Sequence, residues 1–245
     1  MSLALPVDPL VHLSPAQPVR QTAEGGYVSV TSVTDLFSVS AWVNEAVKEL
    51  TGFDILTSIV QPLSGDWERI SRYGDALKKT AACLRGIADN VATTNTTLDY
   101  RWNGNAADAA HTYFASTHRS LTAHADVLDR AATQYQQLAV DAWTLCEAAK
   151  GMVQSIIDKA LLAMIYTAAG TALCETGIGA VAGYALATME VASLMQDINR
   201  ASMRIQTGNM LLQTGFSLMA GISKELQDLG PIPTIGAAYD HPLAR

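Results

Sequence analysis

Apolar residues recur at every seventh position through much of this chain. One series is Ile70, Leu77, Leu84, Val91 and Leu98, and a second is Phe114, Leu121, Leu128, Tyr135, Ala142, Ala149 and Ile156. A heptad repeat of this kind is typical of a helix that packs along its length against another helix. The short segment Trp102-Asn103-Gly104 separates the two series. The pattern therefore predicts an antiparallel helical hairpin over residues 66–157.

The segment between the two predicted helices is rich in residues that end or begin helices. Gly104 can adopt the left-handed backbone conformation that follows a helix end, and Asn105 is a favourable N-cap for the next helix. Asp108 lies three positions later, where its charge suits the positive end of the helix dipole. We expect Trp102 to cover the apolar gap where the two helices diverge.

Small residues form a row beside the first series, at Gly74, Ala81 and Ala88. Small side chains at such positions let a partner helix approach closely. The downstream helix has a second series beside its first, at Thr117, His124, Ala131, Leu138, Leu145 and Met152. Both downstream series continue without Gly or Pro from Asn105 to about Lys150. Antiparallel pairing of Leu98 with Ala110 predicts that Ile70 lies near Leu138.

The residues before the hairpin fall into two segments. Residues 1–32 contain four prolines, which disfavour a helix and predict either an extended segment laid over the surface or disorder. Residues 33–65 are predicted to form a short helix from Thr34 to Leu50, with Gly52 as its stop. An apolar connector from Phe53 to Gly65 follows, and Asp66 is expected to cap the first helix of the hairpin.

The residues after the hairpin also fall into two segments. Residues 158–228 are predicted to form an apolar turn rich in Gly and Ala and a long helix. That helix has its own heptad series, at Tyr184, Val191, Ile198, Ile205, Leu212, Met219 and Leu226. Gly230, Pro231 and Pro233 end it. Residues 229–245 are predicted to be an extended tail, which either docks on the bundle or forms a short recognition peptide.

The stretch from Ala160 to Met189 carries a single formal charge, at Glu175. Its uncharged pieces are each shorter than the roughly 20 residues that a membrane helix needs. We therefore expect a tight turn that reverses the chain at the end of the bundle, made by Glu175, Thr176, Gly177, Ile178 and Gly179. The alternative is a helical hairpin that inserts into a membrane through this turn.

Composition fits an all-α protein with little exposed charge. Only 16% of the 245 residues are charged and 49% are hydrophobic. These values indicate either an Ala-rich helical bundle, because alanine inflates the hydrophobic share, or a surface that is buried against a partner or a membrane. The net charge of −7 argues against nucleic-acid binding, which needs clustered Lys and Arg. We predict an elongated antiparallel helical bundle built on the hairpin, with an extended Pro-rich N-terminus and an extended C-terminal tail.

No arrangement of residues in the sequence indicates catalysis. The chain lacks a Gly-rich phosphate loop after a strand, a Gly-x-Ser-x-Gly elbow and an HExxH motif. His111 and His118 are seven positions apart, about 10 Å along one helix, which is too far for them to share a metal ion. We therefore expect no enzyme activity, no cofactor and no metal.

The cysteines are odd in number and lie in apolar helical sequence, at Cys83, Cys146 and Cys174. They are predicted to be buried as small hydrophobic residues. A Cys146–Cys174 bridge is the alternative.

The Trp102-Asn103-Gly104 turn, followed by Asn-Ala-Ala-Asp-Ala and flanked by two heptad helices, resembles the WXG (Trp-x-Gly) superfamily of type VII (ESX) secretion substrates. The long actinobacterial members are the most similar, together with the WXG-like N-terminal domains of some type VII toxins and channel proteins. Family exporters often carry Tyr-x-x-x-Asp/Glu after the hairpin. None of the eight tyrosines here has an acidic residue four positions on.

The resemblance implies a non-enzymatic secretion substrate, or the partner of a substrate, that acts through helix–helix association. Its expected partners are another WXG-type helical protein or a second copy of itself, together with the type VII secretion machinery. The N-terminus lacks the pattern of a secretory signal peptide, so we expect synthesis in the cytoplasm and type VII export to the cell envelope or medium. The alternatives are a membrane-active or pore-forming protein that uses residues 160–189, and a cytoplasmic helical scaffold.

Overall fold

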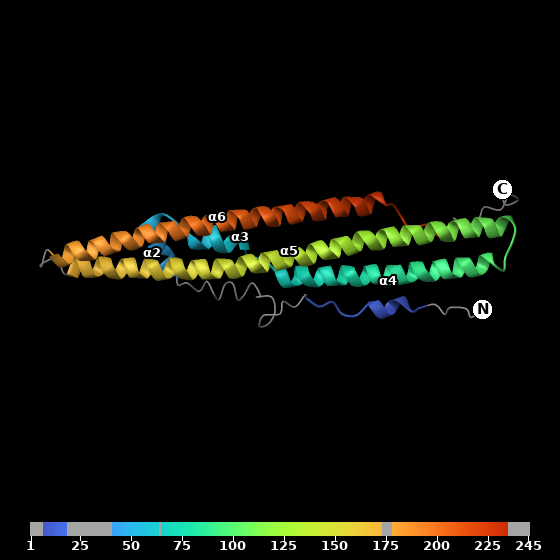
Figure 1. Cartoon of the computed structure of the whole chain (residues 1–245), viewed down its shortest axis with the longest axis horizontal. Helices are drawn as coiled ribbons and strands as arrows, with labels where there is room; N and C mark the ends of the chain where they lie inside the picture. The colour runs from blue at the N-terminus through green and yellow to red at the C-terminus, as the bar shows by residue number, and fades with distance from the viewer. Residues whose placement is uncertain (1–6, 19–40, 64, 173–177, 235–245) are drawn as a thin grey trace. The chain divides into compact units, whose positions relative to one another are not determined.

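The computed structural model describes residues 7–18, 41–63, 65–172 and 178–234. Across these residues every regular element is helical, so the fold is all-α, a bundle of long packed helices (Figure 1). The elements in chain order are η1 (Pro9–His12), α2 (Ala41–Thr51), η2 (Leu56–Val60), α3 (Gln61–Leu63), α4 (Trp67–Asp99), α5 (Asn105–Ala172) and α6 (Ile178–Asp228).

The chain forms two compact units, and α5 and α6 contribute to both. Unit 1 consists of Met1–Val19, Arg69–Gln137 and Gly215–Arg245, and unit 2 consists of Arg20–Glu68 and Leu138–Thr214. The prediction that a helix follows Asp66 and ends near Asp99 is confirmed by α4. The helix that begins at Asn105 is longer than expected, because it continues through the apolar residues beyond Lys150 and ends at Ala172.

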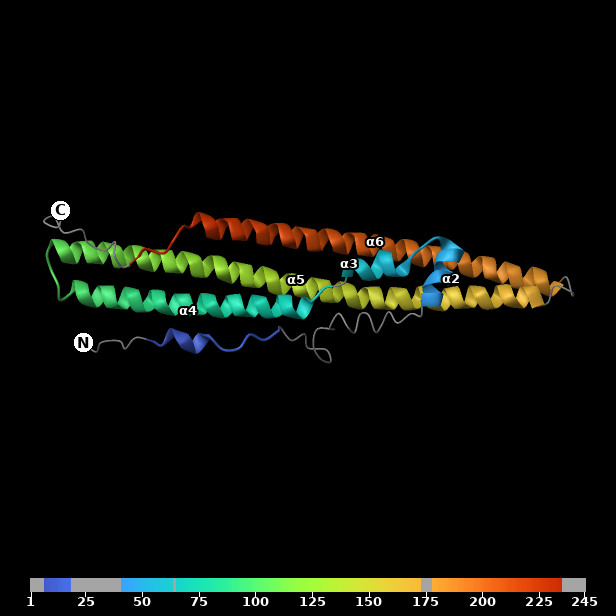
Figure 2. The same cartoon turned by 180° about the vertical axis from the view of Figure 1, so that it is seen from behind.

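In unit 1, α4 packs antiparallel to the first part of α5, side by side in both views (Figures 1 and 2). The rings of Tyr73 and Tyr135 meet edge to face with centroids 4.9 Å apart. Further along, the Asn95 side-chain amide donates to the His111 carbonyl at 3.2 Å. These pairs have the register predicted from Leu98 and Ala110, so the hairpin and its register are confirmed.

The closest part of this interface is the row of small residues rather than the row of large ones. Gly74, Ala81 and Ala88 are buried, whereas every member of the series from Ile70 to Leu98 is only half-buried. A Cβ atom added at Gly74 would lie 3.0 Å from the Ala132 carbonyl oxygen. The two backbones therefore approach so closely that the larger side chains lie at the flanks of the contact.

Residues 7–18 run along α4, which confirms for this part of the chain the prediction of an extended surface segment. Val7 exchanges two hydrogen bonds with the Asn90 side chain, and the Gln17 amide donates to an Asp75 carboxylate oxygen at 2.8 Å. Lys79 donates to the Pro15 carbonyl at 2.6 Å. One short helical turn, η1, interrupts the extended path.

Unit 2 contains the main hydrophobic core. Buried aliphatic residues of α2, η2 and α3 pack against α5 and α6, and the cluster comprises Val43, Val47, Ile55, Ile59, Leu63, Ala149, Val153, Ile156, Ala160, Leu194, Ile198, Ala201 and Ile205. The connector predicted from Phe53 to Gly65 is itself largely helical and supplies three of these residues. Residues 34–40 of the predicted first helix lie outside the described residues, and the described part, α2, ends at Thr51.

Asn44 fixes the connector to α2. Its side-chain oxygen accepts a hydrogen bond from the buried Ile55 amide at 2.9 Å, and its side-chain nitrogen donates to Asp54 at 3.2 Å. A buried asparagine of this kind satisfies backbone groups that the irregular stretch would otherwise leave unpaired.

Within unit 2, α5 and α6 also pack directly on each other. The contact near their ends is between two glycines, because a Cβ atom added at Gly183 would lie 2.5 Å from Gly170 Cα. Residues 173–177 between these helices lie outside the described residues.

Candidate interaction sites

The turn between α4 and α5 is built by backbone hydrogen bonds. The amides of Arg101 and Trp102 both donate to the Leu98 carbonyl, at 2.9 and 2.8 Å, and so close the end of α4. Gly104 has a φ of +103°, a backbone conformation that residues other than glycine rarely adopt. Its carbonyl accepts from the Ala107 and Asp108 amides at 2.8 and 3.1 Å.

These bonds correct the predicted capping roles. Gly104 is the N-cap of α5, since its carbonyl accepts the first bond of that helix. It does not end α4, and Asn105 is the first helical residue instead of the cap. The sequence pattern located the turn correctly. Gly104 and Asn105 both favour helix ends, so the sequence alone did not decide which of them caps α5; the path of the backbone does.

Trp102 is partly exposed at the turn. Its side chain is 44% exposed, and Asn103 and Gly104 are exposed with it. Tyr100, two residues earlier, is 85% exposed. Two large aromatic side chains therefore face solvent at one turn.

Two histidines of α5, His118 and His124, have structural partners. His118 Nδ1 lies 3.0 Å from the Ala88 carbonyl across the α4–α5 interface, and His124 Nδ1 lies 2.8 Å from the Ser120 carbonyl within α5. A ring nitrogen facing a carbonyl oxygen acts as the donor. The described residues contain no group of three or more His, Cys, Asp or Glu side chains arranged to hold a metal ion.

Of the predicted membrane-active turn, Glu175 and Gly177 lie outside the described residues, whereas Gly179 is in the first turn of α6. The neighbouring helix ends expose large apolar side chains: Leu162, Ile165, Val181, Tyr184, Leu186 and Met189. Among the described helices, α5 is long and apolar enough to cross a membrane by length and composition, and 22% of its most apolar 18-residue stretch is buried.

The cysteines within the described residues are free thiols. Cys83 is buried and Cys146 is half-buried, as predicted for small hydrophobic residues, and Cys174 lies outside the described residues. Burial raises the pKa of the Cys146 thiol to about 11, with a smaller contribution from the charge of Glu147. This thiol is therefore protonated and unreactive at neutral pH.

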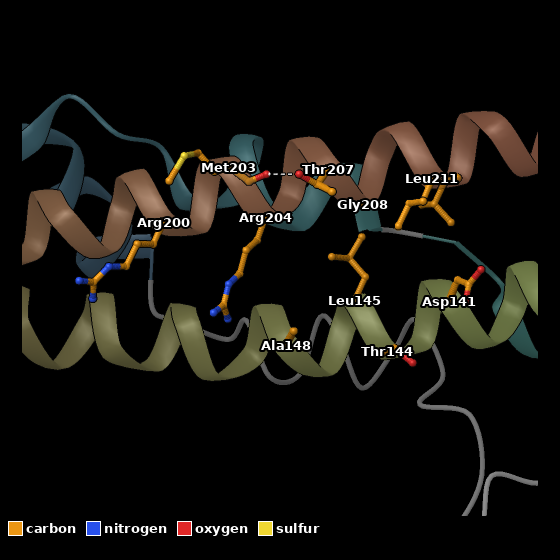
Figure 3. Close-up of a pocket in the computed structure, with 11 residues that line it drawn as sticks. Asp141, Thr144, Leu145, Ala148, Arg200, Met203, Arg204, Thr207, Gly208 and Leu211 are labelled. Carbon is orange, nitrogen blue, oxygen red and sulfur yellow. Dashed lines mark hydrogen bonds between the residues drawn. The ribbon is translucent and has the colours of Figure 1, made fainter.

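A groove between α5 and α6 in unit 2 is a feature that the sequence analysis missed (Figure 3). It has a volume of about 640 Å³, and its lining includes Leu145 and Ala148 from α5 and Arg204, Gly208 and Leu211 from α6. The available signal was the pair of arginines four positions apart, Arg200 and Arg204, because Asp197 is the only other charged residue between Glu190 and Lys224.

Beside this groove, Asp197 is the centre of a polar cluster. Its carboxylate accepts from Lys159 at 2.6 Å and from the Ser155 hydroxyl at 2.7 Å. The hydrogen bond from Lys159, followed by that from Ser155, lowers the pKa of Asp197 against the opposing effect of burial. The carboxylate is therefore ionised at neutral pH and is engaged mainly by Lys159.

No protein-family model, no curated protein and no solved structure matches this chain.

Proposed function

We propose that this chain is a non-enzymatic type VII (ESX) secretion substrate, or the partner of one, which works through helix–helix association. The observation that carries the proposal is the exposed Trp102-Asn103-Gly104 turn between two helices paired in the register of an antiparallel hairpin. The partly exposed indole ring of Trp102 leaves apolar surface in contact with solvent. It is the kind of side chain that supplies binding energy at a protein interface.

Co-expression with a small WXG-type protein encoded beside this gene tests the association. Size-exclusion chromatography of the purified proteins is expected to give one joint peak. Two separate peaks over a wide range of concentrations, with this chain strictly monomeric, would count against association as the working principle.

A substitution at the turn tests export. Trp102→Ala is expected to leave helix content unchanged and to lower thermal stability only slightly, because the residue is already 44% exposed. It is expected to lower the amount of protein in the culture medium by about tenfold, the scale of losing an aromatic residue at the centre of an interface. Trp42→Ala is the matched control, since Trp42 is 59% exposed and lies on α2, which belongs to the other unit. Equal export of both variants would contradict the proposal.

A membrane-active function is the second candidate, favoured by the exposed apolar ends of α5 and α6. Ile165 and Val181 are 59% and 71% exposed and lie in the stretches 160–172 and 178–189, which carry no formal charge. Liposome flotation and dye release test it. Ile165→Ser with Val181→Ser should abolish binding and leakage, whereas Met203→Ser, at an equally exposed position, should not. Absence of wild-type binding at every pH would remove this candidate.

A further inference from the structure

The groove between α5 and α6 continues past its two arginines into a second cavity. The main cavity, of about 640 Å³, and a neighbouring one, of about 320 Å³, share Ala148, Arg200 and Arg204 in their linings. The arginines therefore lie between an apolar section and a smaller polar section that includes Ser155 and Asp197. All of these residues belong to unit 2.

The apolar section is formed by flexible side chains that water reaches. Met203 and Leu211 are 62% and 60% exposed, and Met210 beside them is 61% exposed. The Leu145 side chain extends from α5 to Gly208 of α6. A Cβ atom added at Gly208 would lie only 2.1 Å from the Leu145 side chain. Methionine and leucine at such a surface adapt to the shape of an apolar partner. This section is suited to receive apolar side chains.

The arginines leave positive charge in the groove without full compensation. Both side chains extend from α6 toward α5 (Figure 3). Arg204 has no ion pair within the described part of the chain. Arg200 is 3.5 Å from Asp197, whose carboxylate is already held by Lys159 at 2.6 Å. Asp141 also lines the main cavity but has an interaction of its own. The groove therefore favours a ligand that brings carboxylates.

The occupant that fits both sections is an α-helix. Ala148 and Arg204 each precede a core residue, Ala149 and Ile205, and so point about 100° away from the core around their helices. The core side of α5 and α6 is covered by α2, η2 and α3, while the groove side has no covering element among the described residues. A helix laid in a groove between two others is a common packing arrangement and a common mode of peptide recognition.

We infer that this groove binds an amphipathic helix of a partner protein, one that carries two acidic residues four positions apart beside its apolar stripe. Arg200 and Arg204 have the same spacing, about 6 Å along α6, so two carboxylates on one face of the incoming helix can each meet a guanidinium. The inference rests on the proposed function, because it requires a helical partner. It adds that the partner binds in the groove between α5 and α6 and that the bound helix carries acidic residues.

Two synthetic peptides of about 20 residues, long enough to form helix on binding, test the inference. Both carry a leucine stripe, and beside it one has two Glu four positions apart while the other has Lys at the same places. Fluorescence anisotropy measures the binding of each peptide to the full-length protein. The Glu peptide is expected to bind about tenfold more tightly than the Lys peptide.

The variant Arg200→Gln/Arg204→Gln should lose this discrimination, and Leu211→Ser should weaken both peptides. Arg119→Gln/Lys224→Gln removes the same charge at exposed positions of unit 1 and should leave discrimination unchanged. Circular dichroism checks that each variant is folded.

Three outcomes would overturn the inference. The first is that the Glu peptide does not bind. The second is that the protein still distinguishes the Glu peptide from the Lys peptide when both arginines are replaced. The third is that anionic phosphatidylglycerol vesicles bind in an arginine-dependent way while the Glu peptide does not bind. The last would assign the groove to a lipid surface. Failure here leaves joint elution with a WXG-type protein unaffected, so the inference and the proposed function can fail separately.

Discussion

The helices of the two units pack through buried side chains of different size. All thirteen members of the hydrophobic core cluster belong to unit 2, and ten of them are Val, Ile or Leu. The buried apolar residues of α4 and the first part of α5 are mostly alanines: Ala81, Ala88, Ala107, Ala125, Ala131 and Ala132. Unit 2 is therefore stabilised mainly by the burial of branched side chains, and unit 1 by close backbone approach.

Unit 1 supplements its alanine interface with polar contacts between helices. Asn95 donates to the His111 carbonyl, and Arg85 lies 3.0 Å from Asp126 and 3.3 Å from Asp129. Exposed ion pairs of this kind contribute little, typically less than about 1 kcal/mol each. A heptad repeat specifies helix pairing in both units. The size of the buried residues decides whether a unit is destabilised mainly by cavities, as in unit 2, or by added bulk, as in unit 1.

Truncation of a large core residue in unit 2 should give the largest effect. Ile156→Ala is expected to lower the free energy of unfolding by about 3–4 kcal/mol, because it leaves a cavity at a fully buried position. Urea denaturation followed by circular dichroism measures the change. Ile165→Ala, at a 59% exposed position of the same helix, should cost less than about 1 kcal/mol. Equal losses of stability in the two variants would contradict the view that unit 2 depends on its buried branched side chains.

Added bulk should harm unit 1 by a somewhat smaller amount. Ala88→Leu is expected to cost about 2–3 kcal/mol, because Ala88 is only 1% exposed and a larger side chain would force α4 away from α5. Ala92→Leu, on the half-buried flank of α4, is the control and should be nearly neutral. Unfolding in urea again provides the measurement. If Ala88→Leu stabilised the protein, the interface would have to be loosely packed.

Glycine replacements should separate close contacts from open helix surface. Gly183→Ala is expected to cost about 1–2 kcal/mol, since its Cβ would lie 2.5 Å from the Gly170 backbone. Gly221→Ala should instead stabilise the protein by about 0.5–1 kcal/mol, because nothing lies within 4 Å and alanine is the better helix former. Thermal melting reports both signs. A gain from Gly183→Ala would show that α5 and α6 are not in contact there.

Acid should produce the smallest effect, through Asp197 of unit 2. Lys159 and Ser155 lower the pKa of this carboxyl group in the folded state. Its contribution is therefore fully present above its ordinary pKa of 3.8 and is lost as the pH falls through the lowered value. The urea midpoint of the wild type should fall more steeply below pH 4 than that of Asp197→Asn. Parallel pH profiles would exclude the carboxylate as the source.

Much of the fold could be predicted because helix pairing is encoded locally. The heptad series located α4, α5 and α6, and the pairing of Leu98 with Ala110 gave the register now observed at Tyr73 and Tyr135. The solvent exposure of Trp102 and the capping role of Gly104 could not be predicted in this way. They depend on how closely two helices approach and on the path of the backbone between them.

The sequence by itself determined the all-α class, the position of the hairpin turn and the scarcity of charge, because each follows from the order and spacing of residue types. Only the tertiary structure decided that the α4 interface is made by small residues, that the connector after α2 belongs to the main core and that Arg200 and Arg204 border a groove. The physical reason is that burial depends on distances between segments far apart in the chain, and a periodic pattern gives the face of a helix but not its nearest neighbour.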